Sequence, residues 1–135
     1  QKLQTMEETA IIGISAGASV ALRALETYPD KVKKVITVCG PVTAEYMNQD
    51  TLDNKYPVLK RSLCALSISL LAAESVMTIR PKKDEVVNIE AMALVGAKDV
   101  RLGTSRHAFS IAWTMFTKGR IMADWIHSRP KDDKN

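Results

Sequence analysis

The sequence predicts an α/β fold, a doubly wound and mostly parallel sheet of about four strands with helices on both faces. Two patterns carry this prediction. Short runs of branched apolar residues alternate with longer segments of helical spacing, and strands joined through helices become parallel by right-handed crossovers. The first such run leads directly into a glycine-flanked serine and then a helix. At 135 residues the chain is large enough to bury a core, so we expect one domain over residues 1–135.

Four segments have the length and composition of buried strands. We predict strands over residues 10–14, 32–38, 75–79 and 99–102. Gly40-Pro41 closes the second strand and Pro81 closes the third, because both residue types interrupt regular structure. The carboxyl ends of parallel strands meet at one edge of a sheet, which is where ligand sites of open α/β sheets gather.

The segments between the strands predict the helices. We expect helices over residues 16–28, 57–73, 89–94 and 108–127, and the end of another helix up to Glu8. The last helix carries an apolar stripe from Ile111 to Ile126 that is expected to face the core. Residues 42–56 are polar and are predicted to be irregular, and the charged tail from Pro130 is expected to fray.

Residues 13–17 read Gly-Ile-Ser-Ala-Gly, a Gly-x-Ser-x-Gly motif centred on Ser15. Strand, motif and helix in this order are typical of a nucleophile elbow, a tight turn that lifts a serine Oγ clear of the sheet. We expect a side chain at Gly13 or Gly17 to collide with a neighbouring element. The turn also sets Ser15 at a helix N-terminus, where unpaired N–H groups favour developing negative charge. The alternative is a turn in which two glycines flank a serine by chance.

A serine hydroxyl needs a base to take its proton, and that base needs a third group to hold its tautomer. The chain has two histidines. His107 follows the fourth predicted strand and precedes a helix, so it lies at a carboxyl end as Ser15 does. His127 ends the last helix, where a solvent-exposed or C-capping role is the better interpretation.

The acid is expected from a third carboxyl end. Asp84 follows the third predicted strand and is our assignment. Its competitors are Glu85, which should point away if Asp84 points inward, and Asp99, which would lie at the amino end of its strand. The order Ser15, Asp84, His107 is the chain order of an α/β-hydrolase triad.

Three segments together resemble the C-terminal half to two thirds of an α/β-hydrolase. They are Gly-Ile-Ser-Ala-Gly with Tyr-Pro-Asp-Lys-Val downstream, Asp-Glu-Val-Val from position 84, and His-Ala-Phe-Ser-Ile from position 107. The resemblance implies that Ser15 is the nucleophile, His107 the general base and then acid, and Asp84 the orienting carboxylate. It also implies a missing set of N-terminal strands, from which the family draws one of two oxyanion-hole donors; Ala16 N–H is the other.

Two positions depart from the family's pattern. Asn88 stands where the family often has proline, and Arg106 where it usually has glycine before the histidine. Neither change removes a catalytic atom. Arg106 adds bulk and charge beside the base, which would hinder substrates or attract an anionic one.

These observations predict a serine hydrolase that cleaves a carboxylic ester or related acyl group of a small-molecule substrate through an acyl-enzyme. Acyl transfer to an acceptor other than water would use the same triad. The alternative, from a different class, is a catalytically weak or inactive hydrolase-fold protein that binds a ligand or a partner, because fold does not fix function.

Composition argues against other classes. The net charge is +4, and the basic residues are scattered except for two small clusters, Lys31, Lys33 and Lys34, and Arg80, Lys82 and Lys83. Neither cluster is interleaved with aromatics, so no nucleic-acid partner is expected. The longest apolar stretch, residues 63–73, is too short to span a bilayer. Cys39 and Cys64 have no metal-ligand spacing and no paired base, so we expect no metal, no cofactor and no cysteine nucleophile. Buried free thiols are expected, with a disulfide as the alternative. The compartment stays open, with the cytoplasm favoured.

The first predicted strand carries no charge and no proline. A strand this apolar normally has neighbours on both sides, yet only residues 32–38 are available to pair with it. Since the chain begins with Gln1 and not Met, we expect the other edge to pair with an upstream segment of a longer protein or with a second copy.

Overall fold

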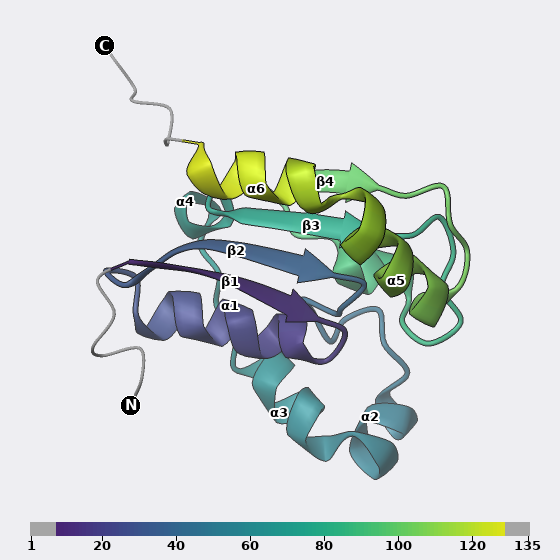
Figure 1. Cartoon of the computed structure of the whole chain (residues 1–135). Helices are drawn as coiled ribbons and strands as arrows, with labels where there is room; N and C mark the ends of the chain where they lie inside the picture. Colours follow the sequence, from purple (N-terminus) through teal and green to yellow (C-terminus); the bar gives the residue numbers. More distant parts are fainter. Residues whose placement is uncertain (1–7, 129–135) are drawn as a thin grey trace.

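The computed structural model describes residues 8–128, so the helix expected before Glu8 and the tail from Pro130 fall largely or wholly outside the described residues. Four parallel strands form one sheet in the order β1-β2-β3-β4 (Figure 1). The strands are β1 (Thr9–Ile14), β2 (Val32–Val38), β3 (Val76–Arg80) and β4 (Lys98–Arg101). Each strand agrees with its prediction to within one residue at either end, and the α/β fold class is confirmed.

Helices cover both faces of the sheet, as a doubly wound arrangement requires. Helix α1 (Gly17–Thr27) lies on one face and α6 (Gly119–His127) on the other (Figure 1). Adjacent strand residues point to opposite faces. Val35 therefore packs with Leu22 of α1, whereas Ile36 belongs to the cluster that includes Met122 of α6. The two clusters hold the strands in place, so that the loops at their carboxyl ends have fixed starting points.

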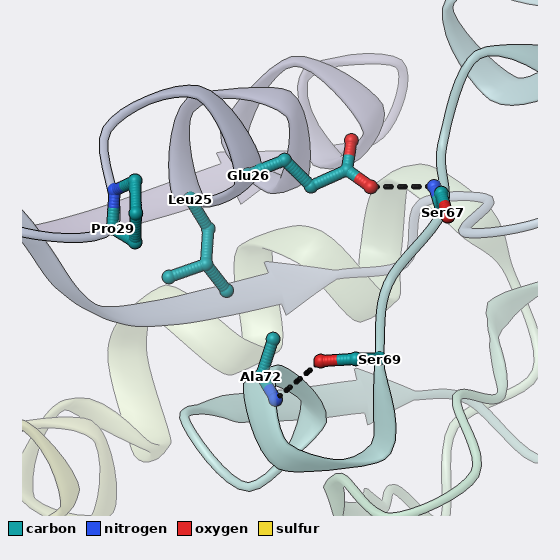
Figure 2. A pocket seen from close by; sticks show the side chains of 6 residues that line it. All are labelled: Leu25, Glu26, Pro29, Ser67, Ser69 and Ala72. Carbon is teal, nitrogen blue, oxygen red and sulfur yellow. Dashed lines mark hydrogen bonds between the residues drawn. The ribbon is translucent and has the colours of Figure 1, made fainter.

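The single helix predicted over residues 57–73 is wrong. Two helices stand there, α3 (Pro57–Cys64) and α4 (Leu70–Ala73). Between them the Glu26 carboxylate of α1 accepts a 2.5 Å hydrogen bond from Ser67 N–H, and the Ser69 hydroxyl accepts one from Ala72 N–H (Figure 2). Serine side chains compete for backbone partners and favour N-caps over helix interiors. Ser69 thus begins α4, and the bond from Ser67 N–H ties the connecting segment to α1, beside a surface hollow of about 360 Å³.

Residues 42–56 are not wholly irregular. They contain α2 (Gln49–Lys55), whose N-cap Asn48 accepts a hydrogen bond from Thr51 N–H. Leu52 is completely buried and anchors the helix. The helix was missed because one apolar residue in seven gives no periodic signal. Its capping asparagine, Asn48, is the signal that could have indicated the start of a helix. The helix expected over residues 89–94 is a shorter 3₁₀ helix, η2 (Ile89–Met92).

The last predicted helix is also divided, into α5 (His107–Thr117) and α6, with Lys118 between them. Lys118 has φ −109° and ψ 5°, outside the α-helical region, and Gly119 follows it. The predicted core stripe holds for Met122 and for Ile111 and Ile126, which pack against the same core cluster. It does not hold for Met115 or Phe116 of α5. Phe116 is 89% exposed, and the buried residues of α5 are His107, Ser110 and Thr114.

Within residues 8–128, no helix combines the length and apolar character needed to cross a membrane. Among the same residues, no group of three or more His, Cys, Asp or Glu side chains is placed to hold a metal ion. Cys39 is buried and Cys64 is exposed, and both are free thiols.

Candidate active site

The three residues predicted for the site lie together at the carboxyl edge of the sheet. Ser15 follows β1, Asp84 follows β3, and His107 follows β4 and opens α5. Ser15 Oγ lies 3.0 Å from His107 Nε2, and His107 Nδ1 lies 2.7 Å from Asp84 Oδ2. Both distances are within hydrogen-bond range. If Nδ1–H donates to the carboxylate, Nε2 carries the lone pair and accepts the serine hydroxyl proton.

Ser15 is held in an unusual backbone conformation. Its φ is +50°, in the left-handed region that non-glycine residues seldom adopt. Its N–H donates to Val38 C=O at 2.9 Å, and its own C=O accepts from Ala18 N–H at 3.0 Å. These two bonds tie the turn to β2 on one side and to α1 on the other, which keeps the half-buried serine pointing out of the sheet.

The close approach around Ser15 depends on two glycines, and one of them is not in the motif. A Cβ at Gly13 would lie 2.5 Å from Gly17 O, as predicted. A Cβ at Gly17 would meet nothing within 4 Å, so the expected collision there is wrong. The second tight position is Gly40, at the end of β2, where a Cβ would lie 2.1 Å from Ser15 O. The β2 turn therefore packs directly against the elbow.

The acid loop orients Asp84 through its own backbone. Asp84 Oδ1 accepts hydrogen bonds from Val86 N–H at 2.8 Å and Val87 N–H at 2.9 Å. This arrangement leaves Oδ2 for the imidazole, and the Asp84 side chain is fully buried. An aspartate that bonds the backbone just after itself is a common turn former. The sequence therefore fixes the Asp84 carboxylate by a purely local interaction.

The two competing carboxylates have other partners. Both oxygens of Asp99 accept from the buried Arg80 guanidinium, at 2.8 and 2.9 Å. These Arg80 hydrogen bonds hold the pKa of Asp99 below its ordinary value, against the opposing effect of burial. Glu85 does not point away from the histidine, contrary to our expectation. Its Oε2 accepts from the main-chain N–H of His107 at 3.0 Å.

Cys39 lies near this site but is chemically unsuited to it. It is completely buried, and it also has a φ of +50°. Burial, and secondarily the negative charge of Asp84, raises the pKa of its thiol to about 12. A thiol with such a pKa stays protonated near neutral pH and is a poor nucleophile.

Similarity searches place this architecture among hydrolases. An α/β-hydrolase from a lagoon-sediment metagenome superposes with a TM-score of 0.59 at 17% identity, covering 93% of this chain and 64% of that one. A hydrolase from Oleispira antarctica gives 0.60 at 12% identity, covering 93% and 67%. A carboxylesterase from Bacillus subtilis gives 0.57 at 10% identity, covering 94% and 62%. The chain has a partial α/β-hydrolase fold. No family model and no curated protein sequence matches it.

The chain spans about two thirds of the length of these hydrolase structures. Within the partial hydrolase fold, β1 is an edge strand that pairs only with β2 among the described residues. Ile12 is in register with Ile36 and so shares its face of the sheet, yet Ile12 is 42% exposed and Ile14 40%. The same chain leaves Trp113 of α5 45% exposed, with Phe109 stacked beside it.

Ala16 completes the elbow of the hydrolase fold. Ala16 is the exposed N-cap residue of α1, with φ −56° and ψ −25°. At a helix N-terminus the first main-chain N–H groups lack partners inside the helix and carry the positive end of the helix dipole. The N–H of Ala16 therefore lies directly after Ser15 in the chain, at the positive end of α1.

Proposed function

We propose that this chain carries the catalytic residues of a serine hydrolase that cleaves a carboxylic ester or a related acyl compound of small-molecule size. The observation that supports it most directly is the continuous series of hydrogen bonds from Ser15 through His107 to Asp84. The series starts at a strained serine on a strand–helix turn, which is the arrangement that activates a hydroxyl. A carboxylesterase among the similar structures also favours an ester.

In the proposed reaction Ser15 Oγ bonds to the acyl carbon while its proton moves to His107 Nε2. The resulting tetrahedral oxyanion faces Ala16 N–H. Collapse of this intermediate breaks the bond to the leaving alcohol, which takes the proton from Nε2. A water molecule then attacks the acyl-serine with His107 again as base, releasing the acid and restoring Ser15. Asp84 holds Nδ1–H throughout and stabilises the transient imidazolium. An alcohol in place of water would give acyl transfer.

A second candidate is a hydrolase-fold protein that binds a ligand or a partner with little turnover. Two observations favour it: β1 has an open edge among the described residues, and the chain spans only about two thirds of the length of comparable hydrolases. Removing one of two oxyanion donors lowers the rate by roughly 10²–10³-fold in well-studied hydrolases. Ala16 alone would then leave a slow enzyme. In either case we infer that β1 is completed by an upstream segment or by a second copy.

Labelling with a fluorophosphonate tests the proposal without any assumption about the substrate. The wild-type chain should be labelled once, and Ser15→Ala should take no label. Ser105→Ala is the matched control, because Ser105 is exposed on the loop that leads to His107. Asp84→Asn should fold normally but react on the order of 10⁴-fold more slowly, through the wrong histidine tautomer. Label retained in Ser15→Ala would exclude Ser15 as nucleophile, and an unlabelled wild type would favour the binding function.

A further inference from the structure

Two consecutive carboxylates hold His107, and they hold different parts of it. Asp84 Oδ2 bonds the imidazole at Nδ1, at 2.7 Å, whereas Glu85 Oε2 bonds the main-chain N–H, at 3.0 Å. The imidazole contact fixes the tautomer and the ring. The main-chain contact holds the backbone of His107. Glu85, which makes this contact, is not one of the three triad residues.

The contact with Glu85 meets a need that α5 does not satisfy by itself. His107 is the first residue of α5, and its N-cap Arg106 makes no side-chain capping bond. The first turn of α5 also holds no acidic residue. The first N–H groups of a helix need acceptors, and a negative charge near them is stabilising. Glu85 provides both an acceptor and a charge, from a loop 22 residues earlier in the chain.

Two features of the acid loop make Glu85 suited to this role. The preceding residue is fixed, because Asp84 Oδ1 is bonded to Val86 and Val87 N–H. Hydrogen bonds from the main-chain N–H of Glu85 itself and then of His107 lower the pKa of Glu85, with smaller effects from the charges of His107 and Arg106. The group is therefore an ionised acceptor near neutral pH.

We propose that Glu85 is a positioning residue, which fixes the main chain of His107 at the start of α5 so that Nε2 stays within hydrogen-bond reach of Ser15 Oγ. The proposal rests on the function proposed above. Without this bond α5 would begin one or two residues later or fray, because its first N–H would have only water as a partner. The imidazole would then keep Asp84 but lose its fixed distance to the serine.

Rates of fluorophosphonate labelling test the positioning role. Loss of one hydrogen bond to a charged group at an exposed position predicts that Glu85→Ala reacts about tenfold more slowly than wild type. Glu85→Gln retains an oxygen that accepts from His107 N–H, so it should recover most of that loss. Glu45→Ala removes another exposed glutamate, before α2, and should react at the wild-type rate. Wild-type labelling of Glu85→Ala, or no recovery in Glu85→Gln, would overturn the proposal.

A second measurement separates this proposal from the proposed function. In an NMR titration of the full chain, the amide proton of His107 should shift with a midpoint below about 4.3, the ordinary value for glutamate. The shift should vanish in Glu85→Gln and persist in Glu45→Ala. This measurement does not depend on catalysis. If the wild-type chain takes no label, the proposed hydrolase function is rejected, but the titration still tests the contact between Glu85 and His107 N–H. A His107 amide that does not titrate below that value would overturn the positioning role, whatever the labelling rates.

Discussion

Replacing Gly40 by alanine should disrupt the elbow, although Gly40 is 25 residues from Ser15 in sequence. The added Cβ would lie 2.1 Å from Ser15 O and 2.5 Å from Ala18 Cβ. Neither atom belongs to a flexible side chain, and Ser15 N–H is already bonded to Val38 C=O. Overpacking of a close-packed site costs about 1–3 kcal/mol, and contact with rigid backbone places this substitution near the upper end.

For a chain of 135 residues, a loss of about 3 kcal/mol lowers the melting temperature by about 10 °C. Calorimetry measures this change directly. The labelling rate of the folded Gly40→Ala protein should also fall, by about 100-fold if Ser15 moves by about 1 Å.

Gly17→Ala is the matched control, because a Cβ there meets nothing within 4 Å and Gly17 begins α1. Alanine favours a helix over glycine by roughly 0.5–1 kcal/mol, so the melting temperature should stay the same or rise by up to about 3 °C. Equal melting temperatures for the two variants would refute the packing of β2 against the elbow.

Two further predictions concern the sheet. The pKa of Asp99 is lowered chiefly by hydrogen bonds from Arg80. The pair therefore contributes its full stabilisation above about pH 3.9, the ordinary pKa of aspartate, and this contribution is lost as the pH falls through the lower pKa of the folded state. The gap in melting temperature between wild type and Asp99→Asn should therefore narrow below about pH 4, and a constant gap would contradict it. Because one edge of β1 is unpaired in the described chain, the 135-residue protein should elute from a sizing column as a dimer or larger species, and a stable monomer would contradict this.

The strands could be predicted closely and the helices only in part, for a physical reason. The residues of β2 and β3 are almost all buried, and both strands are rich in valine and isoleucine, which gives a clear strand signal. Helix boundaries depend on a few polar atoms, as where the Ser69 hydroxyl caps the start of α4. Propensity is a weak guide at such points, because one capping bond outweighs it.

The positions of Ser15, Asp84 and His107 were predictable because each follows a strand of the same parallel sheet. Topology alone brings such positions to one edge. Gly40 and Glu85 were missed because their roles are contacts across space, one with Ser15 O and one with His107 N–H. Arg106 before His107 was a usable signal for the second contact. An arginine cannot accept a hydrogen bond, so a helix that starts after it needs an acceptor from elsewhere.

The exposed apolar side chains of α5 and the open edge of β1 have one explanation. Apart from Ile111, which packs on the core, the inner side of α5 is polar but satisfied, since Ser110 bonds Thr104 at 2.7 Å and the Thr114 hydroxyl donates to Ser110 C=O at 2.8 Å. Its aromatic side chains, Phe109 and Trp113, stack on each other and are 54% and 45% exposed. Exposed apolar surface of this kind marks an interaction site. A segment that paired with β1 and packed on Ile12 and Ile14 would extend the sheet, and we expect its outer elements to cover the aromatic side of α5. Both surfaces should therefore become protected together, in a dimer or in a longer chain, and amide exchange in β1 should slow when Trp113 fluorescence shifts to the blue.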